Sequence, residues 1–279
     1  MNASTSPEQQ ALRHDDALAE RRAHVVQALK QVLPAHAVLS SSENTTPYEC
    51  DGLTAYRQRP MCVALPETYE QVQAVLRTCH ALQVPVVARG AGTGLSGGAM
   101  PHAQGVTLSL ARFNQILRMD AHSRTAVVQC GVRNLAISEA AAPLGLYYAP
   151  DPSSQIACTI GGNVAENSGG VHCLKYGLTL HNVLKVKGLT MAGEWIEFGG
   201  DALDAPGLDL LPLVVGSEGM LAVTLEQIRR ARHMTLADEL RMERDMVRHC
   251  FHTRHLGRSG AASETVEGVR ALAVDKDHA

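Results

Sequence analysis

The chain of 279 residues is long enough for one large domain or two ordinary ones, and its apolar content of 45% supports a packed core. A net charge of −3 without a basic stripe argues against nucleic acid as a partner. No apolar run is long enough to span a bilayer, and the polar N-terminus lacks the apolar segment of a secretory signal.

Cysteine usage indicates a reducing compartment. The count of seven is odd, and no two cysteines have C-x-x-C spacing. This pattern disfavours both a disulfide framework and a zinc site. We therefore expect free thiols and a cytoplasmic protein.

The N-terminal part predicts one helix between polar segments. Residues 1–16 are expected to be disordered, and apolar residues at helical spacing predict a helix over 17–33, ended by Pro34. The polar stretch that comes next contains Asp51 directly before Gly52. Asp51 is either a functional acid or a turn residue, and its position before a glycine favours the turn.

The next segments predict a strand, a helix and a second strand. Residues 61–65 form a short apolar run, Thr68 is a good N-cap for a helix reaching Leu82, and residues 84–88 predict the next strand. Such a unit is expected to be a parallel, right-handed crossover.

A glycine-rich loop comes after the second strand, with glycines at 90, 92, 94, 97 and 98. Arg89 is the only formally charged residue between Pro85 and Leu110. Glycines allow successive backbone N–H groups to converge on one point, and such a nest binds an anion, most often a phosphate. The loop is therefore predicted to hold the pyrophosphate of a dinucleotide.

Two alternatives compete with this interpretation. Gly92, Gly94 and Gly97 satisfy the G-x-G-x-x-G pattern of a Rossmann turn, but Pro101 excludes the helix that such a turn opens, and residues 105–110 predict a strand. A flexible surface loop remains open as the second alternative.

The next residues predict two hairpins, a helix and a buried strand. These segments are strands 116–119 and 125–130, a helix over 134–144, strands 183–191 and 195–198, and a strand over 213–218 that ends in a glycine turn.

Residues 149–177 show no long periodic pattern and are expected to form one long loop. A loop of this length is usually functional, although a plain connector stays open as the alternative. Asn163 and Asn167 can donate and accept hydrogen bonds at once. A nucleophilic dyad of His172 with Cys173 is disfavoured because adjacent side chains on an extended chain point apart, and no metal site is predicted.

These motifs together resemble the PCMH-type, or vanillyl-alcohol oxidase-type, FAD-binding domain, and within it the glycolate oxidase and D-lactate dehydrogenase group. The motifs that carry the resemblance are Tyr48–Gly52, Arg89–Gly94, Ser96–Gly98, Pro150–Ser154, Thr159–Asn163, Ala165–Gly170, His172–Gly177 and Gly216–Gly219. The resemblance implies an α+β fold in which two α/β subdomains hold FAD between them. It places this domain at residues 45–223, with a core from about 58, after an N-terminal helix and linker at 1–44.

The resemblance also implies which residues bind FAD. They are Arg89, Gly90, Ala91, Gly92, Thr93, Gly94, Ser96, Gly97, Gly98, Pro150, Asp151, Ser153, Ser154, Thr159, Gly161, Gly162, Asn163, Asn167, Gly169, Gly170, His172, Glu218 and Gly219. Relatives with covalent flavin carry a histidine in the place of Thr93, so FAD is expected to be held non-covalently here. No catalytic residue is assigned.

The implied chemistry is oxidation of a small 2-hydroxy acid, with hydride transfer to the flavin. The implied partners are a second flavin-type subunit and an iron–sulfur subunit, which would place the protein in the cytoplasm, peripheral to the inner membrane.

Residues 224–279 depart from this family. Their apolar residues have helical spacing, and the segment resembles the C-terminal end of 3-hydroxyisobutyryl-CoA hydrolases, which have the crotonase fold. The substrate-capping domain of flavin relatives is therefore expected to be missing. We interpret the chain as a fusion that truncates the flavin domain near Leu221 to Glu226, with a divergent C-terminus as the alternative. A non-catalytic flavin-binding remnant and, more weakly, an acyl-CoA enzyme are the alternative functions.

Overall fold

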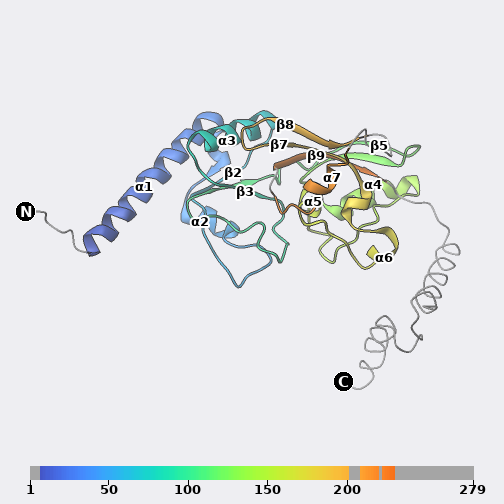
Figure 1. Ribbon diagram of the computed structural model, residues 1–279, viewed down its shortest axis with the longest axis horizontal. Helices are drawn as coiled ribbons and strands as arrows, with labels where there is room; N and C mark the ends of the chain where they lie inside the picture. The colour runs from blue at the N-terminus through green and yellow to red at the C-terminus, as the bar shows by residue number, and fades with distance from the viewer. Residues whose placement is uncertain (1–6, 201–207, 220–221, 230–279) are drawn as a thin grey trace, which may run out of the picture. The chain divides into compact units, whose positions relative to one another are not determined.

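The computed structural model describes residues 7–200, 208–219 and 222–229. Residues Met1–Arg232 form one compact unit, and the expectations for residues 1–6, 201–207, 220–221 and 230–279 lie outside the described residues. The described residues build two β-sheets with helices packed on them (Figure 1). The mixed α and β content agrees with the predicted fold class.

The first sheet has four strands in the order β1-β2-β4-β3. They are β1 (Val38–Leu39), β2 (Cys62–Ala64), β4 (Val106–Ser109) and β3 (Val86–Arg89). Strands β2 and β3 both run parallel to β4, and β1 is antiparallel to β2. The predicted parallel unit is confirmed, but β4 lies between its two strands. Because β3 and β4 are parallel neighbours, the glycine loop has to cross from one end of the sheet to the other.

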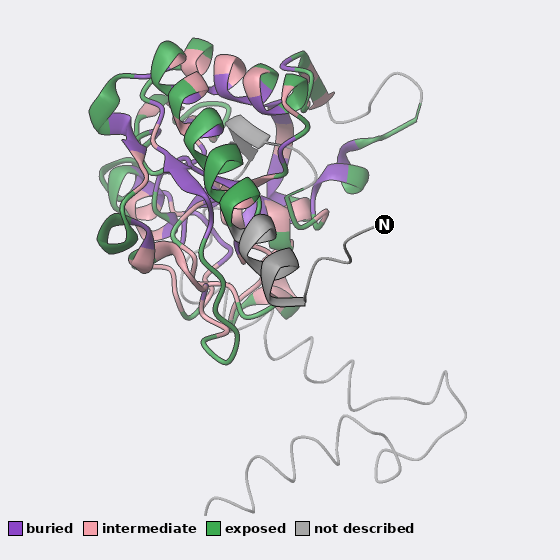
Figure 2. Ribbon diagram, turned by 90° about the vertical axis from the view of Figure 1, so that its left-hand side faces the viewer, coloured by how far each residue is buried: buried purple, intermediate pink, exposed green. Residues whose placement is uncertain are grey.

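Two helices pack with this sheet, α1 (Pro7–Val32) and α3 (Tyr69–Ala81). The predicted cap of α3 is confirmed, since the Thr68 hydroxyl accepts from the backbone N–H of Gln71 at 3.3 Å. Buried residues at helical spacing, among them Leu29 and Val72, face the core, and much of the helix surface turned to the viewer in Figure 2 is exposed. The expectation of disorder up to residue 16 is wrong from Pro7 onward. Pro7 suits the first position of a helix, and the polar residues after it are good helix formers.

Short helical turns occupy the segment between β1 and β2, where the sequence shows only a polar stretch. They are α2 (Ser42–Thr45) and the 3-10 turn η2 (Thr46–Tyr48), after η1 (Ala35–Ala37) before β1. The Ser41 hydroxyl caps α2 by accepting from the N–H of Asn44 at 3.2 Å.

The second sheet is antiparallel throughout, with five strands in the order β5-β6-β9-β7-β8. They are β5 (Ile116–Asp120), β6 (Thr125–Gln129), β9 (Ala222–Arg229), β7 (Val183–Leu189) and β8 (Trp195–Gly199). Both predicted hairpins are confirmed.

Strand β9 corrects the prediction for its own segment. The apolar spacing assigns residues 224–229 to a helical tail, yet their backbone pairs with β6 on one side and β7 on the other. The cause is tertiary. The unpaired edges of β6 and β7 offer hydrogen-bond partners to both sides of this segment, and this pairing stabilises it more than a short isolated helix would.

The remaining helices carry two further corrections. They are α4 (Asn134–Ala141) with η3 (Ala142–Leu144), α5 (Ile160–Glu166), α6 (Cys173–Tyr176), η4 (Thr179–Asn182) and α7 (Leu211–Val214). The helix predicted over 134–144 is confirmed. The loop predicted over 149–177 instead contains α5 and α6, and the strand predicted over 213–218 begins inside α7. The adjacent Gly161 and Gly162 have low helix propensity, so the sequence does not indicate α5. In the structure Ile160 and Val164 of this helix are fully buried one turn apart.

A shared core joins the two sheets. One apolar cluster contains Leu108 of the first sheet and Val186 of the second, together with Val164 of α5. Tyr69 at the start of α3 stacks on Phe113, with ring centroids 5.1 Å apart, and meets Trp195 of β8 edge-on at 5.8 Å. The glycine loop and α5 are therefore carried on one packed framework.

Candidate functional site

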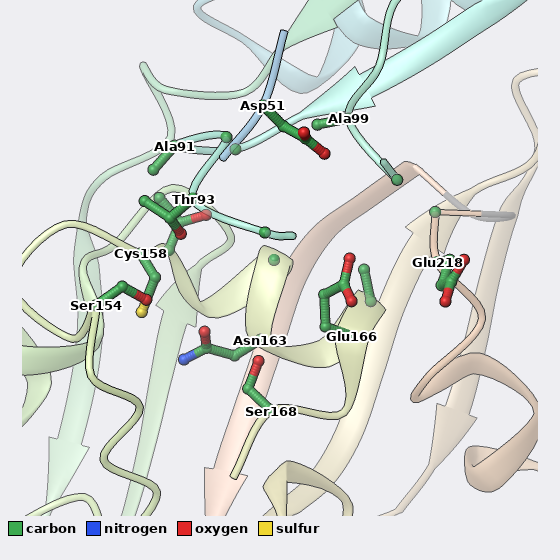
Figure 3. Close-up of a pocket in the computed structure, with 18 of the residues that line it drawn as sticks. Asp51, Ala91, Thr93, Ala99, Ser154, Cys158, Asn163, Glu166, Ser168 and Glu218 are labelled. Carbon is green, nitrogen blue, oxygen red and sulfur yellow. The ribbon is translucent and has the colours of Figure 1, made fainter. Parts of the chain in front are cut away.

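A cavity of about 130 Å³ lies between the glycine loop after β3 and the helix α5 (Figure 3). Its lining comes from four parts of the chain that are distant in sequence: Asp51, residues 88–99, residues 154–168, and the pair Glu218 and Gly219. Only tertiary packing brings these parts together.

The glycine loop needs its glycines for two physical reasons. Gly92 and Gly97 have φ values of +69° and +83°, which side chains rarely adopt. At Gly90 an added Cβ would collide with the Thr159 hydroxyl, so the loop touches the start of α5 through backbone alone. The loop is thus shaped to present main-chain groups to the cavity.

Arg89 does not line this cavity. Its guanidinium Nη1 donates to the carbonyl oxygens of Cys50 at 2.8 Å and Ala99 at 3.4 Å, and it sits over the Tyr48 ring at 5.6 Å. Burial lowers the pKa of Arg89, and the nearby Cys50, Asp51 and Tyr48 oppose this shift. Arg89 therefore clamps the two segments that flank the loop.

Helix α5 places two buried polar atoms at the cavity wall. Thr159, just before the helix, has a hydroxyl Oγ1 without a hydrogen-bond partner among the described residues. Asn163 is 1% exposed, and its amide Nδ2 has no partner there other than the weakly accepting thiol of Cys158. Buried polar groups are normally satisfied, so these two groups are available to a polar ligand in the cavity.

The thiol of Cys158 belongs to the same wall. Burial raises the pKa of this thiol, while hydrogen bonds with Ser154 and Asn163 act in the opposite direction. Cys158 is thus held as a neutral thiol rather than as a reactive thiolate.

The rim of the cavity is fixed by polar contacts to the last turn of α5. The Ser96 hydroxyl donates to the Glu166 carboxylate, at 2.8 Å from Oε1 and 2.9 Å from Oε2. Glu218 has a φ of +54°, and its N–H donates to the carbonyl of Ala165 at 2.8 Å. The turn at Glu218 and the glycine loop are therefore both tied to one helix.

A second polar cluster contains other residues that the sequence nominated. The ring atom Nδ1 of His172 lies 2.6 Å from Oδ2 of Asp151, and the backbone N–H of His172 donates to Oδ1 of Asp151 at 3.3 Å. An added Cβ at Gly170 would collide with Asp151. His172 is thus paired with Asp151, although the chain here enters helix α6 and is not extended as the sequence argument assumed.

The nominated residues divide into two groups in the structure. Those that line the cavity are Gly90, Ala91, Gly92, Thr93, Gly94, Gly98, Ser154, Thr159, Gly162, Asn163, Glu218 and Gly219. Those that lie outside its lining are Arg89, Ser96, Gly97, Pro150, Asp151, Ser153, Gly161, Asn167, Gly169, Gly170 and His172.

Sequence reasoning does not nominate several lining residues, among them Asp51, Ala99, Cys158, Glu166 and Ser168. Glu166 and Ser168 stand inside a motif of the resemblance, so their neighbours could have pointed to them. Asp51 precedes a glycine, and this local signal favours a turn over a site. Nothing in the sequence singles out Cys158. In the part of the chain that the structure describes, no group of three His, Cys, Asp or Glu side chains could hold a metal ion.

A second cavity of about 440 Å³ adjoins the first and shares Gly90, Ala91 and Thr159 with it. Both cavities are therefore bordered by the glycine loop and by Thr159.

Comparison with known families gives two matches in different parts of the chain. The family described as "FAD binding domain" matches residues 60–199, half of the chain. The family described as "Enoyl-CoA hydratase/isomerase" matches residues 212–279, which agrees with the crotonase-like resemblance of the tail.

Curated relatives match up to about three quarters of the chain. The glycolate oxidase subunit GlcD of Escherichia coli (strain K12) is 62% identical over 205 residues, 74% of this chain and 41% of that protein. The D-lactate dehydrogenase of Archaeoglobus fulgidus is 39% identical over 179 residues, 62% of this chain and 40% of that protein. This chain spans about two fifths of the length of these relatives.

Solved structures support the fold. An alkyldihydroxyacetonephosphate synthase superposes with a TM-score of 0.66 at 21% identity, covering 75% of this chain and 40% of that one. A glucose dehydrogenase variant of Phl p 4 gives a TM-score of 0.63 at 18% identity, with 74% and 43% coverage. Among the described residues, no helix is both long and apolar enough to cross a membrane.

Proposed function

We propose an oxidoreductase function for this chain, which belongs to the FAD binding domain family. The proposal is that it holds FAD non-covalently and takes part in oxidising a small 2-hydroxy acid. The observation that carries it is a cavity lined by a glycine loop and by the buried polar groups of Thr159 and Asn163, of which only the Asn163 amide has a partner among the described residues, the weakly accepting Cys158 thiol. These groups fit a cofactor with a diphosphate and several hydrogen-bonding heteroatoms.

The residues of this chain have distinct parts in holding the cofactor. Backbone N–H groups of the loop between Gly90 and Gly98 are proposed to bind the diphosphate, which needs no side-chain charge. The Thr159 hydroxyl and the Asn163 amide would donate to acceptor atoms of the bound cofactor. Thr93 lines the cavity and offers no nitrogen for a covalent link, which supports non-covalent binding.

The substrate class is inferred from the relatives. Proteins named glycolate oxidase subunit, D-lactate dehydrogenase and D-2-hydroxyglutarate dehydrogenase share a 2-hydroxy acid as the oxidised group. Bound FAD supplies the acceptor for the hydride of the α-carbon, and the protein supplies orientation and exclusion of water. The chain spans 41% of the first of these relatives. Catalytic turnover by this chain, the 2-hydroxy acid that it oxidises and its electron acceptor are therefore proposed and not inferred from the match alone.

The same relatives support an assignment of partners and location. The E. coli relative is named as a subunit, so assembly with other subunits is proposed, with a second flavin-type subunit and an iron–sulfur subunit as candidates. The protein would then lie in the cytoplasm, peripheral to the inner membrane through those subunits. We propose the domain boundary near residue 223 because the flavin-type motif reaches Gly219, while the match to the second family already begins at residue 212.

A non-catalytic flavin-binding remnant is the second candidate function. It is favoured by the tail, because residues 212–279 match a different family from the flavin half. In that case the chain binds FAD but lacks the groups that hold and deprotonate a substrate.

One experiment separates the two candidates. The full chain is expressed, its flavin absorbance is recorded, and D-lactate or glycolate is added without oxygen. Bleaching of the flavin supports the oxidoreductase, and a stable yellow colour supports the remnant. A folded but colourless protein that also fails to bind added FAD would refute both.

A further inference from the structure

Asp51 combines a structural role with an unused hydrogen-bonding atom. The residue is 4% exposed, and its Oδ1 accepts from the N–H of Leu53 at 2.9 Å, which is the turn expected from the sequence. Its second carboxylate oxygen, Oδ2, is buried and has no hydrogen-bond partner among the described residues. Asp51 lines the cavity, and Figure 3 shows its carboxylate pointing away from its own backbone into that space.

Asp51 has a cationic neighbour, but one of its two oxygens lacks a hydrogen-bond donor among the described residues. Arg89 interacts electrostatically with Asp51, while its Nη1 donates to the carbonyls of Cys50 and Ala99. A buried carboxylate oxygen without a donor is costly, because folding removed it from water. A donor that occupies the cavity would remove this cost.

The surroundings of Asp51 restrict what that donor is. An added Cβ at the adjacent Gly52 would lie 2.7 Å from the carbonyl of Gly94 and 2.8 Å from that of Thr93, so this turn packs directly on the glycine loop. A diphosphate held by that loop carries only acceptor oxygens and negative charge, and it cannot donate to a carboxylate. The groups that flank a diphosphate in a dinucleotide are sugars, whose hydroxyls can donate.

We propose that Asp51 is a cofactor-positioning residue whose Oδ2 accepts a hydrogen bond from a sugar hydroxyl next to the diphosphate of FAD. The proposal rests on the FAD binding proposed above. A hydroxyl of the ribose on the adenine side and one of the ribityl chain on the flavin side share this chemistry. The carboxylate would thereby fix the position of the diphosphate relative to the glycine loop.

Asp120 provides a matched comparison elsewhere in the chain. Its Oδ1 accepts from the N–H groups of His122 at 2.8 Å and Ser123 at 3.2 Å, so it forms a turn of the same kind. It stands in the hairpin between β5 and β6 and does not line the site cavity. An aspartate that only shapes a turn should behave like Asp120 when its charge is removed.

The test is a titration of the flavin-free full chain with FAD, monitored by flavin fluorescence. Asp51→Asn keeps an oxygen for Leu53 but replaces the free oxygen with an amide, so FAD should bind about 10- to 100-fold more weakly. Asp120→Asn should bind FAD like the unmodified chain. Asp51→Ser, which can also close a turn onto Leu53, should weaken binding in the same direction. ADP and FMN serve as further probes: a loss confined to ADP assigns the ribose hydroxyl, and one confined to FMN the ribityl hydroxyl.

Several results would overturn the proposal. Unchanged FAD affinity in Asp51→Asn would show a turn residue only, and tighter binding would show that the carboxylate merely repels the diphosphate. Loss of folding in both Asp51 variants, judged by circular dichroism, would assign Asp51 to the fold alone. If the unmodified chain binds no FAD, the proposed function fails together with this inference. If the unmodified chain binds FAD and the Asp51 variants bind it with the same affinity, this inference alone fails.

Discussion

At the scale of single residues, Arg89 shows how a charge near an anion site can serve the fold. The sequence associates it with the pyrophosphate loop because it is the lone charge there. The structure shows its Nη1 donating to main-chain carbonyls, with 8% of the residue exposed. A guanidinium suits this task because a single nitrogen carries two N–H donors and can serve two carbonyls. The loop then relies on backbone dipoles for its anion, which explains the density of glycine.

We predict that Arg89→Met destabilises the chain by about 1–3 kcal/mol, because the partly buried carbonyls of Cys50 and Ala99 lose a charged donor. Arg57→Met is the control. Arg57 pairs with Glu49 at 3.1 Å with a side chain that is 66% exposed, so its loss should cost at most about 1 kcal/mol. Urea unfolding of both variants checks this. Equal effects would mean that Arg89 does not clamp the flanking segments.

Two core cysteines allow a prediction about alkaline pH. Cys62 of β2 and Cys79 of α3 are fully buried, and burial raises the pKa of each thiol from an ordinary 9.0 to about 12. A raised folded pKa means that this stability is fully present below about pH 9 and is lost as pH rises toward 12. The unfolding free energy should fall by up to about 1.4 kcal/mol per pH unit per thiol. The double variant Cys62→Ala/Cys79→Ala should show a shallower fall in urea titrations across this range. An equal fall of the unfolding free energy with pH in the variant and the unmodified chain would contradict the raised pKa of these thiols.

At the scale of elements, α5 joins the core to the cavity. Its buried face, with Ile160 and Val164, packs into the interior, while Gly162 and Asn163 line the cavity. The helix has only seven residues and two glycines, which in isolation would not form. Packing therefore holds a helix that sequence propensity disfavours, and places its first turn against the glycine loop.

The two glycines of α5 should respond in opposite ways to alanine. A Cβ at Gly161 would lie 2.8 Å from Cβ of Cys130 and 3.1 Å from its carbonyl oxygen, so Gly161→Ala should cost about 1–3 kcal/mol through overpacking. A Cβ at Gly162 meets only the Thr159 hydroxyl, at 3.5 Å, so Gly162→Ala should leave stability unchanged or raise it by up to about 1 kcal/mol. Thermal unfolding of the ligand-free variants measures both. A stable Gly161→Ala variant would show that α5 can move away from Cys130.

At the scale of the described fold, β9 decides whether the second sheet is complete. The strand pairs with β6 and β7 at the centre of five strands, and it lies in the segment matched by a different family. Backbone pairing tolerates such a change of sequence because ladder hydrogen bonds use main-chain groups that all residues share. A junction in this strand can thus preserve the sheet while the chain beyond the strand is replaced.

We predict that a chain ending at Gly219 aggregates, whereas a chain ending at Arg232 stays folded. The shorter chain lacks β9 and leaves the edges of β6 and β7 unpaired, while the longer one contains the whole first compact unit. Size-exclusion chromatography and circular dichroism of both chains provide the measurement. A monomeric, folded short chain would show that β9 is dispensable.

The amino-acid sequence determined the features that depend on local pattern. The Thr68-capped helix, the strands around the glycine loop and both hairpins could be predicted from spacing, caps and turns, because neighbouring residues alone set these preferences. The motifs also sufficed for the family, which the match over residues 60–199 confirms.

Only the tertiary structure decided which atoms face the cavity. Tertiary packing determines that Arg89 donates to main-chain carbonyls, that a helix begins at Ile160 and that residues 224–229 form a strand. It also left one oxygen of Asp51 bonded in a turn and the other without a donor among the described residues, a division no local pattern expresses. The physical reason is that burial and edge pairing are set by segments far apart in the chain, and these outweigh the small free-energy differences among local conformations.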